Sequence, residues 1–406
     1  MIAKQSLAER AGAVMTRNYR PSPIAFDHGD GMWLYDTEGK RYLDFAAGIA
    51  VSALGHNHPA LTRAIAEQAR KLLHTSNLWL NEPGVRAMEL IVERSFGDRV
   101  FFGNSGAEAI EASLKIARRY MQAVRGEERY GFITALDSFH GRTWAAISAT
   151  GQPKYHKGFK PLVPGFTHVP YGELGAIEAA IDDTTCAVLV EPIQGEGGII
   201  VPPDGYLEGL RALCDRAGIL LIFDEVQTGV GRTGRWFGYE HAGVRPDVMA
   251  LAKGLGGGVP VGAMVCTEAV AAGFEPGVHA STFGGNPLAC SAVVAVMQTI
   301  EEEGLLPRVE AVGDQLGAGL DALVDEFDGV VEARGRGLMR GLAIDEGVLD
   351  RGAIRAAAEA KGLLVTLAGH DALRLTPPLI AESAHVEAAL EILHDAIAEV
   401  AGKGAA

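Results

Sequence analysis

The sequence is poor in cysteine, which excludes two common ways of stabilising a fold. Its four cysteines, Cys186, Cys214, Cys266 and Cys290, lie far apart and include no C-x-x-C pair. A disulfide-rich secreted domain or a structural zinc site needs paired, closely spaced ligands. We therefore expect neither disulfides nor a metal, and the 406-residue chain must be held by a hydrophobic core.

Long apolar runs are also missing, which excludes a membrane-spanning helix. Apolar runs such as residues 218–223 and 186–190 are far shorter than the roughly 20 residues that a span requires. Residues 1–20 lack the apolar centre of a signal peptide and are typical of a short amphipathic helix. We therefore expect a cytoplasmic protein with no membrane partner.

Positive charge is in deficit, since 36 Lys and Arg face 51 Asp and Glu, for a formal net charge of -15. This balance argues against nucleic acid as a general partner, although a local basic pocket for a small anion stays open. With 48% hydrophobic residues, the composition is that of a soluble enzyme with a large core, and the length suggests two or three domains.

What the sequence does have, after residue 99, is a regular alternation of short apolar runs and helical stretches. The predicted strands are residues 100–102, 132–135, 187–190, 220–223, 248–251 and 263–266. The predicted helices include residues 106–125, 173–181 and 205–217. This alternation predicts an α/β fold, with a parallel or mostly parallel sheet covered by helices on both faces.

The two ends of the chain show a different sequence pattern. Residues 25–45 predict a small meander of short strands, and the remaining helices are expected at residues 59–73, 84–94, 287–325, 351–361 and 383–401. We expect an N-terminal arm and part of a small domain in residues 1–55, a large domain in residues 56–305, and the C-terminal α+β part of the small domain in residues 306–406.

One lysine lies in an unusual setting. Lys253 stands between an apolar strand, residues 248–252, and a glycine-rich loop, residues 254–258. Most lysines are solvated surface charges. A buried ammonium loses water, which lowers its pKa and makes the amine nucleophilic.

Three other segments offer partners for this lysine. Asp224 ends an apolar strand, where open α/β sheets bind ligands. Ser105 lies between a strand and a helix whose N-terminus can hold one phosphate. In the segment DSFHGRTW, Arg142 can bind a carboxylate, and Phe139 or His140 can stack on a flat ring. Taken singly, these residues also fit a salt bridge, a helix cap and loop packing.

Together the four features match pyridoxal 5′-phosphate, which needs a lysine for its aldehyde, a carboxylate for its pyridine nitrogen, a seat for its phosphate and a stacking face. The motifs, in order, are NSGAEA, FHGRT, EPIQGEGG, FDEVQTGVGRTG, ALAKGLGGGVPVGA, STFGGNPLA, RGRGL and LRLTPPL. From about residue 14 onward, the chain resembles class III pyridoxal-phosphate aminotransferases, most closely their acetylornithine branch. The resemblance implies fold type I, with a mostly parallel seven-stranded sheet in a large domain and a small α+β domain built from both chain ends.

The same resemblance implies the residues that hold the cofactor ring. Lys253 would link to the cofactor and carry a proton between it and the substrate carbon, while Asp224 keeps the pyridine nitrogen protonated. Gln227 would hydrogen-bond the side of the ring hydroxyl. Phe139 would stack on one face of the ring, and Val226 would lie against the other.

For the phosphate, the resemblance implies Ser105, Gly106 and Ala107. Many relatives have threonine where this chain has Ala107, so its backbone amide must serve there. Thr282 would reach the phosphate of a neighbouring subunit's cofactor, which implies a homodimer.

Four further residues are implied to select the substrate. Arg142 would bind the carboxylate distal to the reacting amine, and Arg374 the α-carboxylate of 2-oxoglutarate or glutamate. Glu196 would neutralise Arg374 while the amine donor is bound, because a buried arginine must have a partner. Tyr19 would lie near the donor's α-nitrogen, where relatives specific for 4-aminobutyrate tend to carry an aliphatic residue.

The implied reaction moves the terminal amino group of N2-acetylornithine to 2-oxoglutarate, giving N-acetylglutamate 5-semialdehyde and glutamate in arginine biosynthesis. Ornithine, N-succinylornithine and 4-aminobutyrate are alternative donors, and a racemase or decarboxylase on the same fold is an alternative activity. A non-catalytic cofactor-binding sensor would need a DNA-reading domain, for which residues 1–20 are too short.

Overall fold

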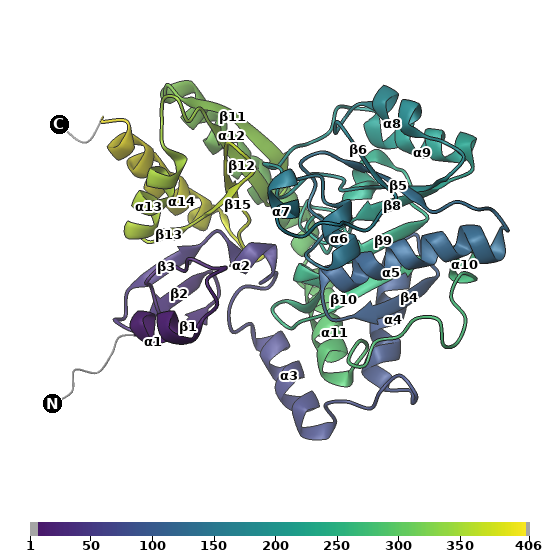
Figure 1. Ribbon diagram of the computed structural model, residues 1–406. Coiled ribbons are helices and arrows are strands. Elements are labelled where there is room, and N and C mark those ends of the chain that lie inside the picture. Colours follow the sequence, from purple (N-terminus) through teal and green to yellow (C-terminus); the bar gives the residue numbers. More distant parts are fainter. Residues whose placement is uncertain (1–6, 403–406) are drawn as a thin grey trace.

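The computed structural model describes residues 7–402, which form one seven-stranded and two four-stranded sheets (Figure 1). The helix predicted within residues 1–20 is α1 (Leu7–Val14), and the first six positions of that prediction lie outside the described residues. No helix in residues 7–402 is long and apolar enough to cross a membrane.

The large sheet confirms the predicted mostly parallel architecture. Its strands are β4 (Arg99–Gly103), β5 (Gly131–Ala135), β6 (Phe166–Val169), β7 (Thr185–Val190), β8 (Leu220–Asp224), β9 (Val248–Leu251) and β10 (Gly262–Cys266). They lie in the order β4-β10-β9-β8-β7-β5-β6, and only β10 runs antiparallel to its neighbours. The sequence did not predict β6, because this edge strand is short, half-exposed and lacks an apolar run.

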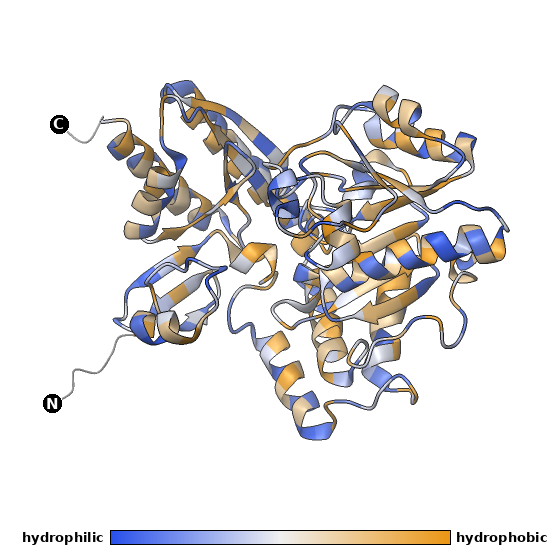
Figure 2. Ribbon diagram, in the orientation of Figure 1, coloured by the Kyte–Doolittle hydropathy of each residue, from blue (hydrophilic) through white to orange (hydrophobic). Residues whose placement is uncertain are grey.

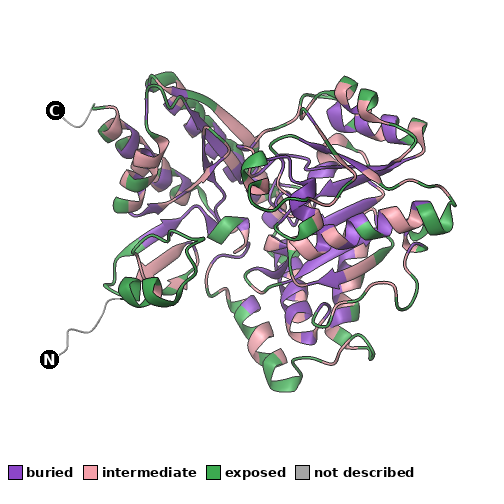
Figure 3. Cartoon of the chain, viewed as in Figure 1, coloured by how far each residue is buried: buried purple, intermediate pink, exposed green. Residues whose placement is uncertain are grey.

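The central strands alternate their side chains between two hydrophobic clusters, so both faces of the sheet are covered. In β8, Leu220 and Ile222 pack in the cluster that contains Ile110 of α5 (Gly106–Arg119). Leu221 and Phe223 belong to the other cluster. Because both faces are buried, these strands read as continuous apolar runs, which is why the sequence predicted them (Figures 2 and 3).

The remaining helices of this part surround the sheet. They are α3 (Pro59–Lys71), α4 (Glu82–Arg94), α6 (Trp144–Ala149), α7 (Pro153–His156), α8 (Leu174–Ala180), α9 (Tyr206–Ala217), α10 (Glu268–Ala271) and α11 (Pro287–Glu302). The predicted helix at residues 106–125 is α5 continued by a π-helical turn, η1 (Tyr120–Val124). The helical region predicted at residues 287–325 is two helices, because Gly304, with φ +60°, separates α11 from α12 (Leu305–Glu326).

The two ends of the chain share a smaller sheet. The predicted meander is β1 (Phe26–Asp30), β2 (Trp33–Asp36) and β3 (Arg41–Asp44), and β3 pairs in parallel with β13 (Leu363–Leu364). The third sheet contains β11 (Val330–Arg336), β12 (Met339–Ile344), β15 (Ala372–Leu375) and β14 (Thr366–Ala368). Helices α2 (Ala47–Ala50), α13 (Arg351–Ala360) and α14 (Ser383–Val400) complete this region. The small domain is therefore built from both ends of the chain, as Figure 1 shows.

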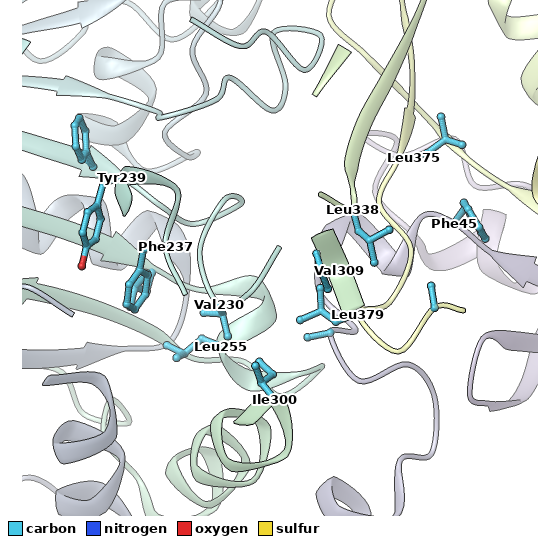
Figure 4. Packing of buried hydrophobic residues seen from close by; sticks show 14 of the residues in the cluster. Phe45, Val230, Phe237, Tyr239, Leu255, Ile300, Val309, Leu338, Leu375 and Leu379 are labelled. Carbon is cyan, nitrogen blue, oxygen red and sulfur yellow. The ribbon is translucent and has the colours of Figure 1, made fainter. Parts of the chain in front are cut away.

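We propose domain borders near residues 55 and 305. Helix α11 packs on α3 and α4, whereas α12 packs on β11 and α14 of the small domain. The hydrophobic cluster nevertheless continues across this border, from Val230 and Ile300 to Val309 and Leu338 (Figure 4).

A buried arginine ties the two parts together. Arg232, in the loop after β8, donates from Nη1 to the backbone oxygens of Leu338, at 3.0 Å, and Pro377. Burial lowers the pKa of its guanidinium to about 9. Since Pro377 follows β15, this contact fixes the strand that carries Arg374 against the large domain.

Candidate active site

A cavity of about 400 Å³ lies where the carboxyl ends of β8 and β9 meet the N-terminus of α5. The predicted site residues that line it are Ser105, Gly106, Ala107, Phe139, Arg142, Asp224, Val226, Gln227 and Lys253. Ligands of α/β sheets bind at this edge, so the strand order itself places these residues together.

Lys253 follows β9 directly and begins a short 3₁₀ turn, η3 (Lys253–Gly256). Its φ of +47° is uncommon for a residue with a side chain and marks local backbone strain. Burial lowers the pKa of its ammonium, and the nearby charge of Glu196 only partly opposes this shift. Within residues 7–402, no hydrogen bond or ion pair holds its Nζ atom.

Asp224 is the last residue of β8, and its carboxylate is hydrogen-bonded to a histidine. Its Oδ2 lies 2.7 Å from Nδ1 of His140, and its Oδ1 accepts from the backbone N–H of Val226 at 3.0 Å. A carboxylate can only accept, so Nδ1 of His140 carries the proton. The sequence offered His140 as an alternative stacking residue, whereas its side chain is fully buried behind Asp224. The two residues are 84 positions apart in the sequence, so no local pattern indicates this contact.

A second carboxylate in the cavity was missed by the sequence reasoning. Glu191 accepts from the backbone N–H of Phe139 at 3.1 Å and of Gly195 at 2.9 Å, so it joins two loops of the site. Burial raises its pKa to about 7. Its signal was available, because Glu191 follows the apolar strand β7 just as Asp224 ends β8.

The N-terminus of α5 forms an anion seat. Ser105 caps the helix by accepting from the N–H of Glu108 at 3.2 Å. The first N–H groups of a helix have no partner within it, which leaves those of Gly106 and Ala107 for a ligand. A Cβ atom on Gly262 would lie 2.1 Å from the Ser105 oxygen, so glycine is required there for β10 to approach this turn.

An ion pair lies beside the cavity. Arg374, only 2% exposed, pairs through Nη1 with Glu196 and also donates to Oε1 of Gln227 at 3.2 Å. Its Nε donates to Thr366 at 3.0 Å. Burial alone would raise the pKa of Glu196, but the positive charges of Arg374 and Lys253, together with the hydrogen bond from Arg374, outweigh it, and the net shift is downward. The backbone oxygen of Glu196 accepts a hydrogen bond from the N–H of Gly369 at 2.9 Å, which holds the backbone of this loop in place. The Glu196 side chain can therefore move away from Arg374 without a movement of the loop.

Besides Glu196 and Arg374, two more predicted site residues do not line the cavity of a single chain. Tyr19 is 71% exposed and lines a surface hollow formed by its own arm. Thr282 lines another hollow, beside Ser281, whose Oγ lies 3.3 Å from Nδ2 of Asn104.

The fold and this lysine-centred cavity define a fold-type I pyridoxal-phosphate enzyme. The family model of class-III aminotransferases matches residues 14–397, and the chain belongs to this family. An acetylornithine aminotransferase of Caldanaerobacter subterraneus is 50% identical, covering 94% of this chain and 96% of that protein. The enzyme of the same name from Gloeobacter violaceus is 52% identical, covering 94% and 95%.

Solved structures of aminotransferases have the same overall fold as this chain. An ornithine aminotransferase of Toxoplasma gondii has a TM-score of 0.94 at 34% identity, covering 98% of this chain and 95% of that one. An acetylornithine aminotransferase of Elizabethkingia anophelis has a TM-score of 0.86 at 32% identity, covering 97% and 98%. Pyridoxal 5′-phosphate is the cofactor of the family. The cavity fits it, with an unpaired lysine, a carboxylate backed by His140 and a helix N-terminus as an anion seat.

The buried carboxylate next to Asp224 gives a pH prediction. Glu225 accepts from Thr228 and from the backbone N–H groups of Gly238 and Tyr239, both at 2.8 Å, and burial raises its pKa from 4.5 to about 7. A raised pKa means that the protonated carboxyl stabilises the fold below pH 4.5, and this stabilisation is lost as the pH rises through 7. We expect Glu225→Gln, which cannot titrate, to destabilise the holoenzyme most near pH 5. The difference from wild type should shrink by about 2 to 3 kcal/mol at pH 8.

Urea unfolding of both proteins at several pH values measures this difference. Glu128→Gln, at an exposed position, is the control and should show no such trend. A difference for Glu225→Gln that stays constant from pH 5 to pH 8 would contradict the prediction.

Proposed function

We propose that this chain transfers the terminal amino group of N2-acetylornithine to 2-oxoglutarate, forming N-acetylglutamate 5-semialdehyde and glutamate, a step of arginine biosynthesis. The observation that carries the proposal is the position of Lys253 in a cavity that an unpaired arginine, Arg142, also lines, while a second arginine, Arg374, lies beside the cavity and is neutralised by Glu196. The names of the two full-length relatives at 50% and 52% identity support the same donor.

We assign the predicted residues to the cofactor as follows. When bound, pyridoxal 5′-phosphate supplies an aldehyde that condenses with amines and a ring that accepts electrons from the substrate carbon. Asp224, supported by His140, holds the proton on the pyridine nitrogen. Phe139 and Val226, which line the cavity, would contact the two faces of the ring, and Gln227 would hydrogen-bond the side of its hydroxyl. Ser105, Gly106 and Ala107 would donate to the phosphate.

Lys253 attaches the cofactor and acts as the base. Its Nζ would take the proton from the substrate carbon that bears the reacting nitrogen and deliver it to the cofactor, and it would carry the proton in the reverse direction in the second half of the reaction. A base must be neutral, and burial favours the neutral amine by lowering the pKa of Lys253.

Charge selects which amine reacts. Arg142 has no ion pair within residues 7–402, so it is free to bind the carboxylate distal to the amine. Arg374 is neutralised by Glu196, so an ω-amine donor meets no free cation there. When glutamate binds, its α-carboxylate replaces Glu196 on Arg374, and the Glu196 side chain moves away.

A homodimer completes this proposed site. Two loops that expose large apolar side chains are joined, since Asn77 donates to the backbone oxygens of Ser281 and Gly284 at 3.1 and 2.8 Å. Trp79 is 67% and Leu80 92% exposed. Such a patch is typical of a protein interface, and we propose that a second copy covers it. Thr282 would then reach the cofactor phosphate of that copy, and Tyr19 would contact the donor once the arm is placed by the dimer.

Kinetics with a panel of donors test the proposed reaction. With 2-oxoglutarate as acceptor, we expect the highest kcat/KM for N2-acetylornithine among this donor, ornithine, N-succinylornithine and 4-aminobutyrate. The margins should be modest for close homologues, because a pocket that binds one carboxylate discriminates weakly along the chain. A kcat/KM for ornithine about tenfold or more above that for N2-acetylornithine would overturn the choice of donor.

Removal of the counter-charge on Arg374 tests the charge selection. In Glu196→Ala, Arg374 loses its ion-pair partner in every state, so glutamate should bind about tenfold more tightly and the preference for the ω-amine donor should fall by a similar factor. Glu196→Gln, which keeps the volume and removes the charge, should behave in the same way. An unchanged ratio of the two kcat/KM values in both variants would contradict this role.

The dimer is tested by placing a charge in the exposed patch. We expect Leu80→Asp to sediment as a monomer and to lose at least about tenfold in activity, because a desolvated charge opposes association. Val124→Asp, at an exposed apolar position on a different segment, is the matched control and should remain dimeric. A Leu80→Asp protein that is monomeric and fully active would show that Thr282 is not needed.

A further inference from the structure

Arg142 reaches the cavity without any polar partner to hold it. Its side chain is exposed, and no ion pair or hydrogen bond within residues 7–402 fixes the guanidinium. The contacts that orient it are aromatic, since its Cζ lies 4.0 Å from the ring centroid of Tyr155 and 5.4 Å from that of Phe139. Both contacts are within the range of a cation–π interaction, and the contact to Tyr155 is the shorter of the two.

The ring of Tyr155 is itself held in place by the surrounding turn. Tyr155 lies on α7, and the preceding Gln152 donates to the backbone oxygens of Asp137 and Ser138 at 3.1 and 3.0 Å. On the other side, Nε2 of His156 lies 2.8 Å from the Thr150 oxygen. The ring also meets Phe139 edge to face, with centroids 5.8 Å apart. Tyr155 is therefore a fixed surface on which a mobile side chain can rest.

An exposed arginine samples many rotamers, and ordering it when a substrate binds costs conformational entropy. A ring that holds the guanidinium beforehand lowers that cost and leaves all five N–H donors free for a carboxylate. The ring face rather than the hydroxyl provides this contact, because the Tyr155 hydroxyl has no hydrogen bond within residues 7–402. Lys154 also places its Nζ 4.9 Å from this ring, so the ring faces a second cation at the same edge of the site.

We propose that Tyr155 is a positioning residue that orients Arg142 to receive the substrate carboxylate distal to the reacting amine. This inference rests on the proposed function of Arg142. Loss of the ring should weaken every substrate that carries this carboxylate and leave a simple amine unaffected. An effect through Phe139 would instead weaken the cofactor and slow all amines alike.

The experiment compares holoenzymes of wild type, Tyr155→Leu, Tyr155→Met and Tyr155→Phe. Each is measured with N2-acetylornithine and with pentylamine, an amine without a carboxylate. The affinity for glutarate, a non-reacting dicarboxylate, is measured by titration of the cofactor absorbance, and the dissociation constant of the cofactor is measured separately. The Met variant replaces the Leu variant if the latter fails to fold by circular dichroism.

For the ring-less variants we expect KM for N2-acetylornithine and Kd for glutarate to rise about tenfold, with kcat, pentylamine turnover and cofactor affinity within about twofold of wild type. Tyr155→Phe should match wild type. In an Arg142→Ala background, Tyr155→Leu should add no further loss.

An unchanged Kd for glutarate, an equal loss for pentylamine, or a Phe variant as weak as the Leu variant would overturn the proposal. If wild type fails to use N2-acetylornithine, the proposed donor is wrong. The glutarate affinities of the same variants still decide the role of Tyr155.

Discussion

The burial of the Lys253 ammonium is the constraint on which the rest of the site depends. A charged amine taken out of water is costly unless its pKa falls or a counter-charge approaches, and both occur here. Glu196 lies close enough to oppose the shift, yet its own charge is committed to Arg374. The lysine is therefore left as a weakly basic amine facing a cavity, in a backbone conformation that few residues with a side chain adopt.

The large sheet brings the site residues together because they follow adjacent strands. Strands β8 and β9 pair in parallel with Asp224 opposite Ala250, so the residues that follow both strands open into one cavity. The small domain adds Arg374 from β15, and the Arg232 contact to Pro377 sets the position of that strand. The Glu196 loop is fastened to the same domain through Gly369. The proposed catalytic and substrate-binding groups thus come from both of the proposed domains, whose hydrophobic packing is continuous.

The sequence predicted most of the large sheet and cavity residues such as Lys253, Asp224 and Ser105, because their patterns are local in the chain. Buried strands such as β8 appear in the sequence as apolar runs, and the turn before α5 has the pattern of a helix N-terminus that binds an anion. Contacts between distant residues have no such local pattern. The sequence therefore did not predict the hydrogen bond between His140 and Asp224, although both residues lie in predicted site segments. The edge strand β6 was missed because half-exposed strands lack a continuous apolar run. Tyr19 and Thr282 line other hollows, and their predicted roles rest on the proposed dimer.

The central claim is that one lysine carries the cofactor. Borohydride reduction of the purified wild-type enzyme, followed by proteolysis and mass spectrometry, tests this claim most directly, because reduction makes a link between an amine and the cofactor permanent. If Lys253 carries the cofactor, reduction yields a single modified peptide, with the added mass on Lys253. A modified peptide that contains another lysine, such as Lys154 or Lys115, or the absence of any modified peptide in an enzyme that retains activity, would contradict it.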